Sequence, residues 1–139
     1  MSTVLNFLFL VFILFFEFII CENSVYSYYK SHDEFVSMKW EHFIAIYDEI
    51  FILYRNQKDF RLLEIGVQNG GSLQIWSSYF GPGSDIVGVD VDEKVCTDLS
   101  FRKGITVHCL DIVAVDESTL NLLGQFDVII VGICVFLCR

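Results

Sequence analysis

Four short apolar runs, separated by stretches with helical character, most constrain what this chain can fold into. The runs lie at residues 61–65, 86–90, 105–110 and 126–131, and the helical stretches between them lie at 72–80, 93–102 and 116–123. Strands that alternate with helices are joined by right-handed crossovers, which produce a parallel sheet. The sequence therefore predicts an α/β fold with a parallel sheet of about four strands.

A long amphipathic helix is expected before the first strand, at about residues 34–55, after a polar and aromatic entry segment at 25–33. Apolar and aromatic residues recur along this helix at spacings of three and four, which places them on one face. They are Val36, Trp40, Phe43, Tyr47, Ile50 and Tyr54.

The first 24 residues form an apolar leader. Its unbroken apolar run, residues 7–16, fits the roughly 7–15 residues of a signal-peptide core. Glu17 interrupts the longer run, whereas a membrane-spanning helix needs roughly 20 apolar residues. Three interpretations stay open: a signal peptide, an uncleaved anchor that contacts the membrane, or a non-native extension. The first two imply a secretory or membrane-associated protein, and the third implies a cytoplasmic one.

Charge and cysteine content exclude some functions. The formal net charge is −9, which argues against a nucleic-acid partner because phosphate binding depends on clustered Lys and Arg. The five cysteines form no C-x-x-C pair and no Cys/His cluster, so no metal site is expected. We expect buried free thiols and a reducing compartment. The cysteines are Cys21, Cys96, Cys109, Cys134 and Cys138.

The most informative stretch is Glu64-Ile-Gly-Val-Gln-Asn-Gly-Gly-Ser72, between the first strand and the next helix. Gly66 permits a tight turn and lets a ligand approach the backbone. Gly70 opens the helix, whose free N–H groups face the same crevice. Asp90 and Asp111 end the second and third strands. Ligands of open parallel sheets bind at these strand ends, where a carboxylate can accept the hydroxyls of a ribose.

Two nucleotide ligands compete for this site. A dinucleotide fingerprint has three glycines, and Gln68 replaces the middle one, which would crowd a pyrophosphate. S-adenosylmethionine has no phosphate, and its sulfonium and amino groups are cationic, so an acid such as Glu64 suits it. The residues favour the methyl donor, and an NAD-type oxidoreductase half-domain stays as an alternative.

The sequence resembles class I S-adenosylmethionine-dependent methyltransferases over about residues 39–131. The most similar group comprises macrocin-type sugar O-methyltransferases and cephalosporin-hydroxylase-like proteins. The matching stretches are Lys39–Tyr47, Leu62–Trp76, Tyr79–Gly83 and Ile86–Asp92, and the string E-I-G-V-Q-N-G-G-S is the most specific.

The resemblance implies a Rossmann-like domain and a role for each site residue. The loop with Glu64, Gly66, Gln68 and Gly70 would cradle the methionine part of the donor. Asp90 would hold the ribose, and Asp111 would lie near the adenine. The acceptor would be a small-molecule hydroxyl. His42 is a weak candidate for the general base.

The chain departs from these relatives after its fourth strand. They continue with an acidic D-D-G-S-H-like stretch that supplies Mg²⁺ ligands, whereas residues 128–139 contain no carboxylate. Class I domains also carry about three more strands. We therefore expect residues 25–139 to be a partial domain, with the donor half present and the metal ligands missing. Its fourth strand would be an exposed sheet edge that could support an oligomer. Whether the chain is an enzyme stays open, with a non-catalytic remnant or binding module as the alternative.

Overall fold

The computed structural model describes residues 23–33, 41–99 and 105–132. The strands are β1 (Arg61–Ile65), β2 (Asp85–Asp90), β3 (Ile105–Cys109) and β4 (Val128–Val131). The helices are α2 (Val25–Ser31), α3 (Glu41–Phe51), α4 (Gly71–Phe80), α5 (Glu93–Leu99) and α6 (Glu117–Leu122). Residues 1–22 of the apolar leader lie outside the described residues. Within them, no helix has the length and apolarity to cross a membrane.

The four strands form one parallel sheet in the order β3-β2-β1-β4. The chain starts at β1 in the interior, moves outward through β2 to β3, and then returns to the other side of β1. This order places the carboxyl ends of all four strands along one edge of the sheet. The expected α/β, Rossmann-like fold with four parallel strands is confirmed.

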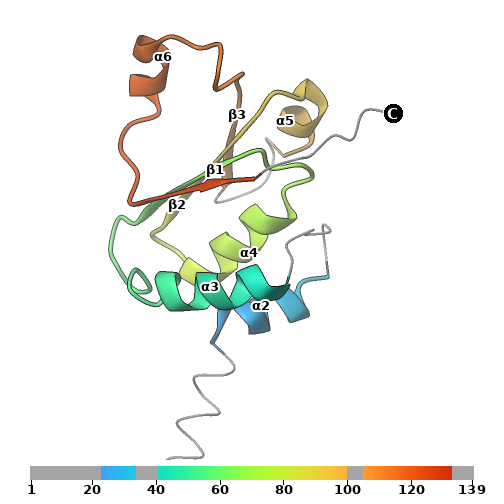
Figure 1. Ribbon diagram of the computed structural model, residues 1–139, viewed down its shortest axis with the longest axis vertical. Coiled ribbons are helices and arrows are strands. Elements are labelled where there is room, and N and C mark those ends of the chain that lie inside the picture. The colour runs from blue at the N-terminus through green and yellow to red at the C-terminus, as the bar shows by residue number, and fades with distance from the viewer. Residues whose placement is uncertain (1–22, 34–40, 100–104, 133–139) are drawn as a thin grey trace, which may run out of the picture.

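The helices cover the two faces of the sheet unequally. Helices α2, α3 and α4 lie together on one side, and α6 lies well away from them (Figure 1). A large core cluster joins this helical side to β1 and β2 through Leu62 and Ile86. A smaller cluster on the other face includes Leu63 and Val89, and α6 contributes no buried residue to it.

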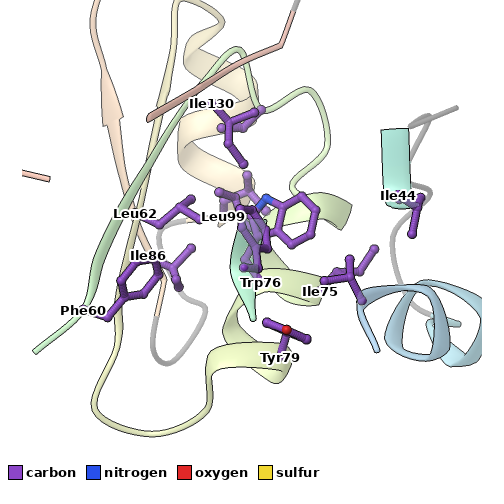
Figure 2. Packing of buried hydrophobic residues seen from close by; sticks show 13 residues of the cluster. Ile44, Phe60, Leu62, Ile75, Trp76, Tyr79, Ile86, Leu99 and Ile130 are labelled. Carbon is purple, nitrogen blue, oxygen red and sulfur yellow. The ribbon is translucent and has the colours of Figure 1, made fainter. Parts of the chain in front are cut away.

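Trp76 of α4 lies at the centre of the larger cluster. Its ring is fully buried and lies near Leu62, Leu99 and Ile130 (Figure 2). Edge-on contacts with Tyr47 and Phe51 of α3 have ring-centroid distances of 5.1 Å each. Aromatic pairs of this geometry stabilise beyond the area that they bury. Trp76 thus connects the sheet to the outer helix.

The helical region before β1 differs from the expectation in two ways. The buried face of α3 contains Ile44 and Phe51, whereas Phe43 and Ile50 are 45% and 43% exposed. The expected apolar face was therefore wrong at these two positions. In the described chain α3 ends at Phe51 and turns follow, while residues 34–40 of the expected helix lie outside the described residues.

The entry segment at 25–33 contains helix α2. The Ser24 hydroxyl accepts a hydrogen bond from the Ser27 N–H at 3.0 Å. The Asp48 carboxylate of α3 accepts hydrogen bonds from the N–H groups of Val25 and Tyr26. Because this second cap comes from another helix, no local sequence pattern announces it.

The expectation of free thiols was wrong for two cysteines. Cys96 of α5 and Cys109 of β3 form a disulfide, with Cα atoms 5.7 Å apart. Helix α5 runs back beside β3, which brings together residues that are 13 positions apart in the sequence. Cys21, Cys134 and Cys138 lie outside the described residues.

Candidate functional site

A cavity of about 1110 Å³ opens at the carboxyl ends of the strands, and we call it the strand-end pocket. Its walls come from the loop after β1, the end of β2, helix α5, the segment after β3 and the end of β4. Its lining is Ile65, Gly66, Gln68, Asn69, Val89, Asp90, Val91, Asp92, Lys94, Val95, Asp98, Leu99, Leu110, Asp111, Ile112, Val113, Val131 and Gly132. Four of the six expected donor-binding residues are in this set.

Asp90 connects the loops of the pocket. One carboxylate oxygen accepts hydrogen bonds from the N–H groups of Val67 at 2.9 Å and Gln68 at 3.1 Å. The other accepts from the N–H of Asp92 at 3.1 Å. A carboxylate offers roughly four acceptor positions, so one position remains for a ligand hydroxyl. Asp90 therefore both shapes the glycine loop and can bind a ligand.

Gly66 lets β1 and β4 end in close contact. It has a positive φ of 80°, and a Cβ atom there would lie 2.7 Å from the carbonyl oxygen of Gly132. The Gly132 N–H in turn donates to the Ile65 carbonyl at 2.7 Å. A side chain at either glycine would push the two strand ends apart. Gly132, which the sequence analysis did not single out, is therefore as much part of the loop geometry as Gly66.

Gln68 occupies the middle position of the glycine-rich loop. Its φ is +54°, the left-handed region that non-glycine residues rarely adopt. The residue is exposed and lines the pocket. A side chain is therefore present where a dinucleotide fingerprint has the glycine that lets a pyrophosphate reach the backbone.

Glu64 and Gly70 lie beside the pocket and are not part of its lining. The Glu64 side chain is 1% exposed, and its carboxylate accepts hydrogen bonds from Ser72 Oγ and Trp76 Nε1, each at 2.9 Å. Glu64 thus connects β1 to α4. Gly70 is buried against Leu99 of α5, where a Cβ atom would lie 2.5 Å from a Leu99 methyl carbon.

The charge of the lining is mostly negative. Asp90, Asp92, Asp98 and Asp111 carry the carboxylates, and Lys94 carries the single ammonium group. Lys94 lies 3.6 Å from Asp98, one turn further along α5. This excess of negative charge favours a cationic or neutral ligand over a phosphate-rich one.

Sequence reasoning placed Asp111 in the site and did not identify the wall that α5 forms. Val95, Asp98 and Leu99 of that helix line the pocket. The sequence signal for this wall was Asp92, a residue type that often caps the start of a helix. Its carboxylate accepts a hydrogen bond from the Lys94 N–H at 2.9 Å, so α5 begins at the pocket. Val95 and Leu99, the apolar lining residues of α5, lie within the two turns that follow this start.

The weak base candidate His42 lies in α3, and its side chain lies outside the described part of the structure. None of the α3 residues whose side chains the structure describes, 43–51, lines the pocket. Among the described residues, no group of three or more His, Cys, Asp or Glu side chains could hold a metal ion.

Comparison with known proteins gives a structural likeness. No family model and no curated protein matches the chain. Among solved structures, the chain is similar to the plantazolicin methyltransferase BpumL, crystallised with a monoazolic desmethylPZN analog and SAH. The two share 22% sequence identity with a TM-score of 0.49, and the match covers 61% of this chain. The chain spans about a third of that structure, since 32% of its length is covered.

Proposed function

We propose that the strand-end pocket binds S-adenosylmethionine and that the chain has the donor half of a methyltransferase. The observation that carries this proposal is the pairing of Asp90 with the glycine loop inside a pocket whose charged residues are mostly carboxylates. A sulfonium compound with a ribose but no phosphate suits this combination of charge and hydrogen-bond acceptors.

The residues of the pocket fit such a ligand. Asp90 keeps an acceptor position for a ribose hydroxyl beside the three backbone N–H groups that it already binds. The volume of about 1110 Å³ exceeds the upper end of ordinary ligand pockets, roughly 1000 Å³. Leu110 and Ile112 provide apolar surface for a flat base next to Asp111. The cavity therefore has room for a donor and for part of an acceptor.

When bound, the donor would supply an electrophilic methyl group. The residues of the chain would contribute orientation, because a methyl group transfers in line and only to a nucleophile held close to it. Asp90 would hold the ribose of the donor, and the backbone turn at Gly66 would contact the donor from one side. The resemblance to sugar O-methyltransferases favours a small-molecule hydroxyl as the acceptor.

Calorimetric titration with S-adenosylhomocysteine tests the donor site. We expect binding by the full chain and a loss of roughly tenfold or more in affinity for Asp90→Ala, as expected when a hydrogen-bonded carboxylate worth about 1.5–3 kcal/mol is removed. Asp85→Asn is the matched control, because it changes a carboxylate at the opposite end of the same strand. No heat with the wild-type chain, or equal affinity for Asp90→Ala, would reject the assignment.

Two alternatives predict different results. A non-catalytic binding module binds S-adenosylhomocysteine but transfers no methyl group in an assay with added magnesium, so turnover by this chain would reject it. An NAD-type half-domain changes the fluorescence of NADH and does not respond to the methyl donor. Gln68 and the acidic lining count against the second alternative.

A further inference from the structure

The Cys96–Cys109 disulfide lies in the wall of the strand-end pocket. It joins helix α5 to the last residue of β3. Leu99, three residues after Cys96, and Leu110 and Asp111, directly after Cys109, all line the pocket. The bond therefore holds two separate parts of the lining at a defined distance from each other.

Both cysteines are also next to Asp90. Cys109 is the register partner of Asp90 in the pairing of β2 with β3. Cys96 Sγ lies 3.7 Å from the Asp90 carbonyl oxygen, which accepts a hydrogen bond from the Leu110 N–H at 2.9 Å. A change at the disulfide thus reaches the residue proposed to hold the ribose through direct contacts.

Helix α5 has few other attachments in the described part of the chain. Of its seven residues, Cys96 and Leu99 are buried, and Val95 is partly buried against the larger core cluster. An isolated helix shorter than roughly 12–15 residues is only marginally stable in water. The position of α5 therefore depends on the packing of Val95 and Leu99 and on the covalent bond from Cys96.

The two cysteines differ in accessibility. Cys109 is exposed, whereas Cys96 is 8% exposed. Thiol–disulfide exchange requires access to the sulfur that is attacked, so this difference favours attack at Cys109.

We propose that Cys96–Cys109 is a thiol–disulfide exchange site that controls the ligand affinity of the strand-end pocket. The thiolate of a low-molecular-weight thiol attacks Cys109 Sγ, and Cys96 leaves as a thiolate and takes up a proton. A second thiolate attacks the mixed disulfide and releases Cys109, so that two molecules of thiol are oxidised to one disulfide and the protein cystine is reduced to two thiols. The reduced protein has a looser α5 and a weaker pocket. The identity of the ligand rests on the proposed function.

The test compares S-adenosylhomocysteine binding by the full chain before and after treatment with dithiothreitol. We expect reduction to raise the Kd roughly tenfold, within the range of 5–150-fold typical of coupled sites. The control is the double variant Cys96→Ser/Cys109→Ser, which should bind weakly with and without dithiothreitol. Because it retains Cys21, Cys134 and Cys138, any effect of the reductant through those residues would appear in it.

Two measurements test the disulfide and its effect on α5 without any bound ligand. Peptide mapping of the oxidised chain should recover a fragment linked through Cys96 and Cys109, and its absence would overturn the proposal. Hydrogen exchange at residues 93–99 should become faster on reduction in the chain without ligand, and unchanged exchange would also overturn it.

Failure of the two proposals can be told apart. If neither redox state binds S-adenosylhomocysteine, the donor-site assignment fails, while faster exchange in α5 on reduction still supports a redox-controlled pocket wall. If the oxidised, reduced and doubly substituted proteins bind with equal affinity, the donor site stands and the coupling is rejected.

Discussion

Glu64 is a buried carboxylate that positions the glycine loop by holding α4 against β1. Its two oxygens accept hydrogen bonds from Ser72 and Trp76 at the start and middle of α4. A buried charge is costly unless such donors surround it. By holding α4 against β1, Glu64 positions the loop that connects them, although Glu64 itself is not in the lining of the strand-end pocket.

Substitutions of Glu64 should separate this structural role from ligand contact. Glu64→Ala removes the acceptor of two buried donors and leaves a cavity, so we expect the free energy of unfolding to fall by about 3 kcal/mol. Glu64→Gln keeps the shape and one acceptor oxygen, so the loss should be about 1 kcal/mol. Urea unfolding followed by tryptophan fluorescence measures both. A Gln variant of wild-type stability with much weaker S-adenosylhomocysteine binding would instead show that Glu64 contacts the ligand.

The site residues show what the sequence could predict at this scale. Gly66, Gln68, Asp90 and Asp111 line one pocket as expected, because strand ends in a parallel sheet meet at one edge. Glu64 differs because strand residues alternate between faces, and it shares its face with Leu62 beneath α4. The direction of the Glu64 side chain relative to the pocket depends on which face of the sheet α4 covers. The spacing of the glycines does not reveal that face.

At the scale of elements, the four strands were predictable because each is a short apolar run bounded by polar or glycine residues. The buried face of α3 and the capped start of α2 were not predictable, because both depend on contacts between helices. Asp48 caps α2 from α3, and Trp76 packs against Phe51 rather than Phe43. Pairing of Cys96 with Cys109 likewise requires the path of α5 across β3.

The packing of α4 against α5 can be tested at Gly70. Gly70→Ala places a Cβ atom 2.5 Å from a Leu99 methyl carbon, in a residue whose φ is +81°. We expect Gly70→Ala to cost about 1 kcal/mol from backbone strain and a further 1–3 kcal/mol, roughly, from overpacking. Chemical unfolding measures the loss, and a loss of about 1 kcal/mol or less would contradict tight packing between the two helices.

At the scale of the whole molecule, the two faces of the sheet are unequally covered and the edge at β4 is open in the described residues. Helices α2, α3 and α4 cover one face (Figure 1), whereas on the other face Ile129 and Val131 of β4 are 58% and 64% exposed. Within the described residues, no strand pairs with the outer edge of β4. Exposed apolar edge strands favour association with other chains, and the formal net charge of −9 opposes it by repulsion.

These opposing effects predict self-association through β4 that strengthens with salt, because salt screens the repulsion between chains. Ile129→Lys places a charge on the edge strand, and we expect the association constant to fall by roughly tenfold, which corresponds to about 1.4 kcal/mol. Leu122→Lys is the matched control, since Leu122 is 86% exposed and lies on α6 rather than on β4. Sedimentation velocity at low and high salt measures the association. An equal change in both variants would contradict a contact at β4, because an added lysine lowers the net negative charge equally on α6 and on β4.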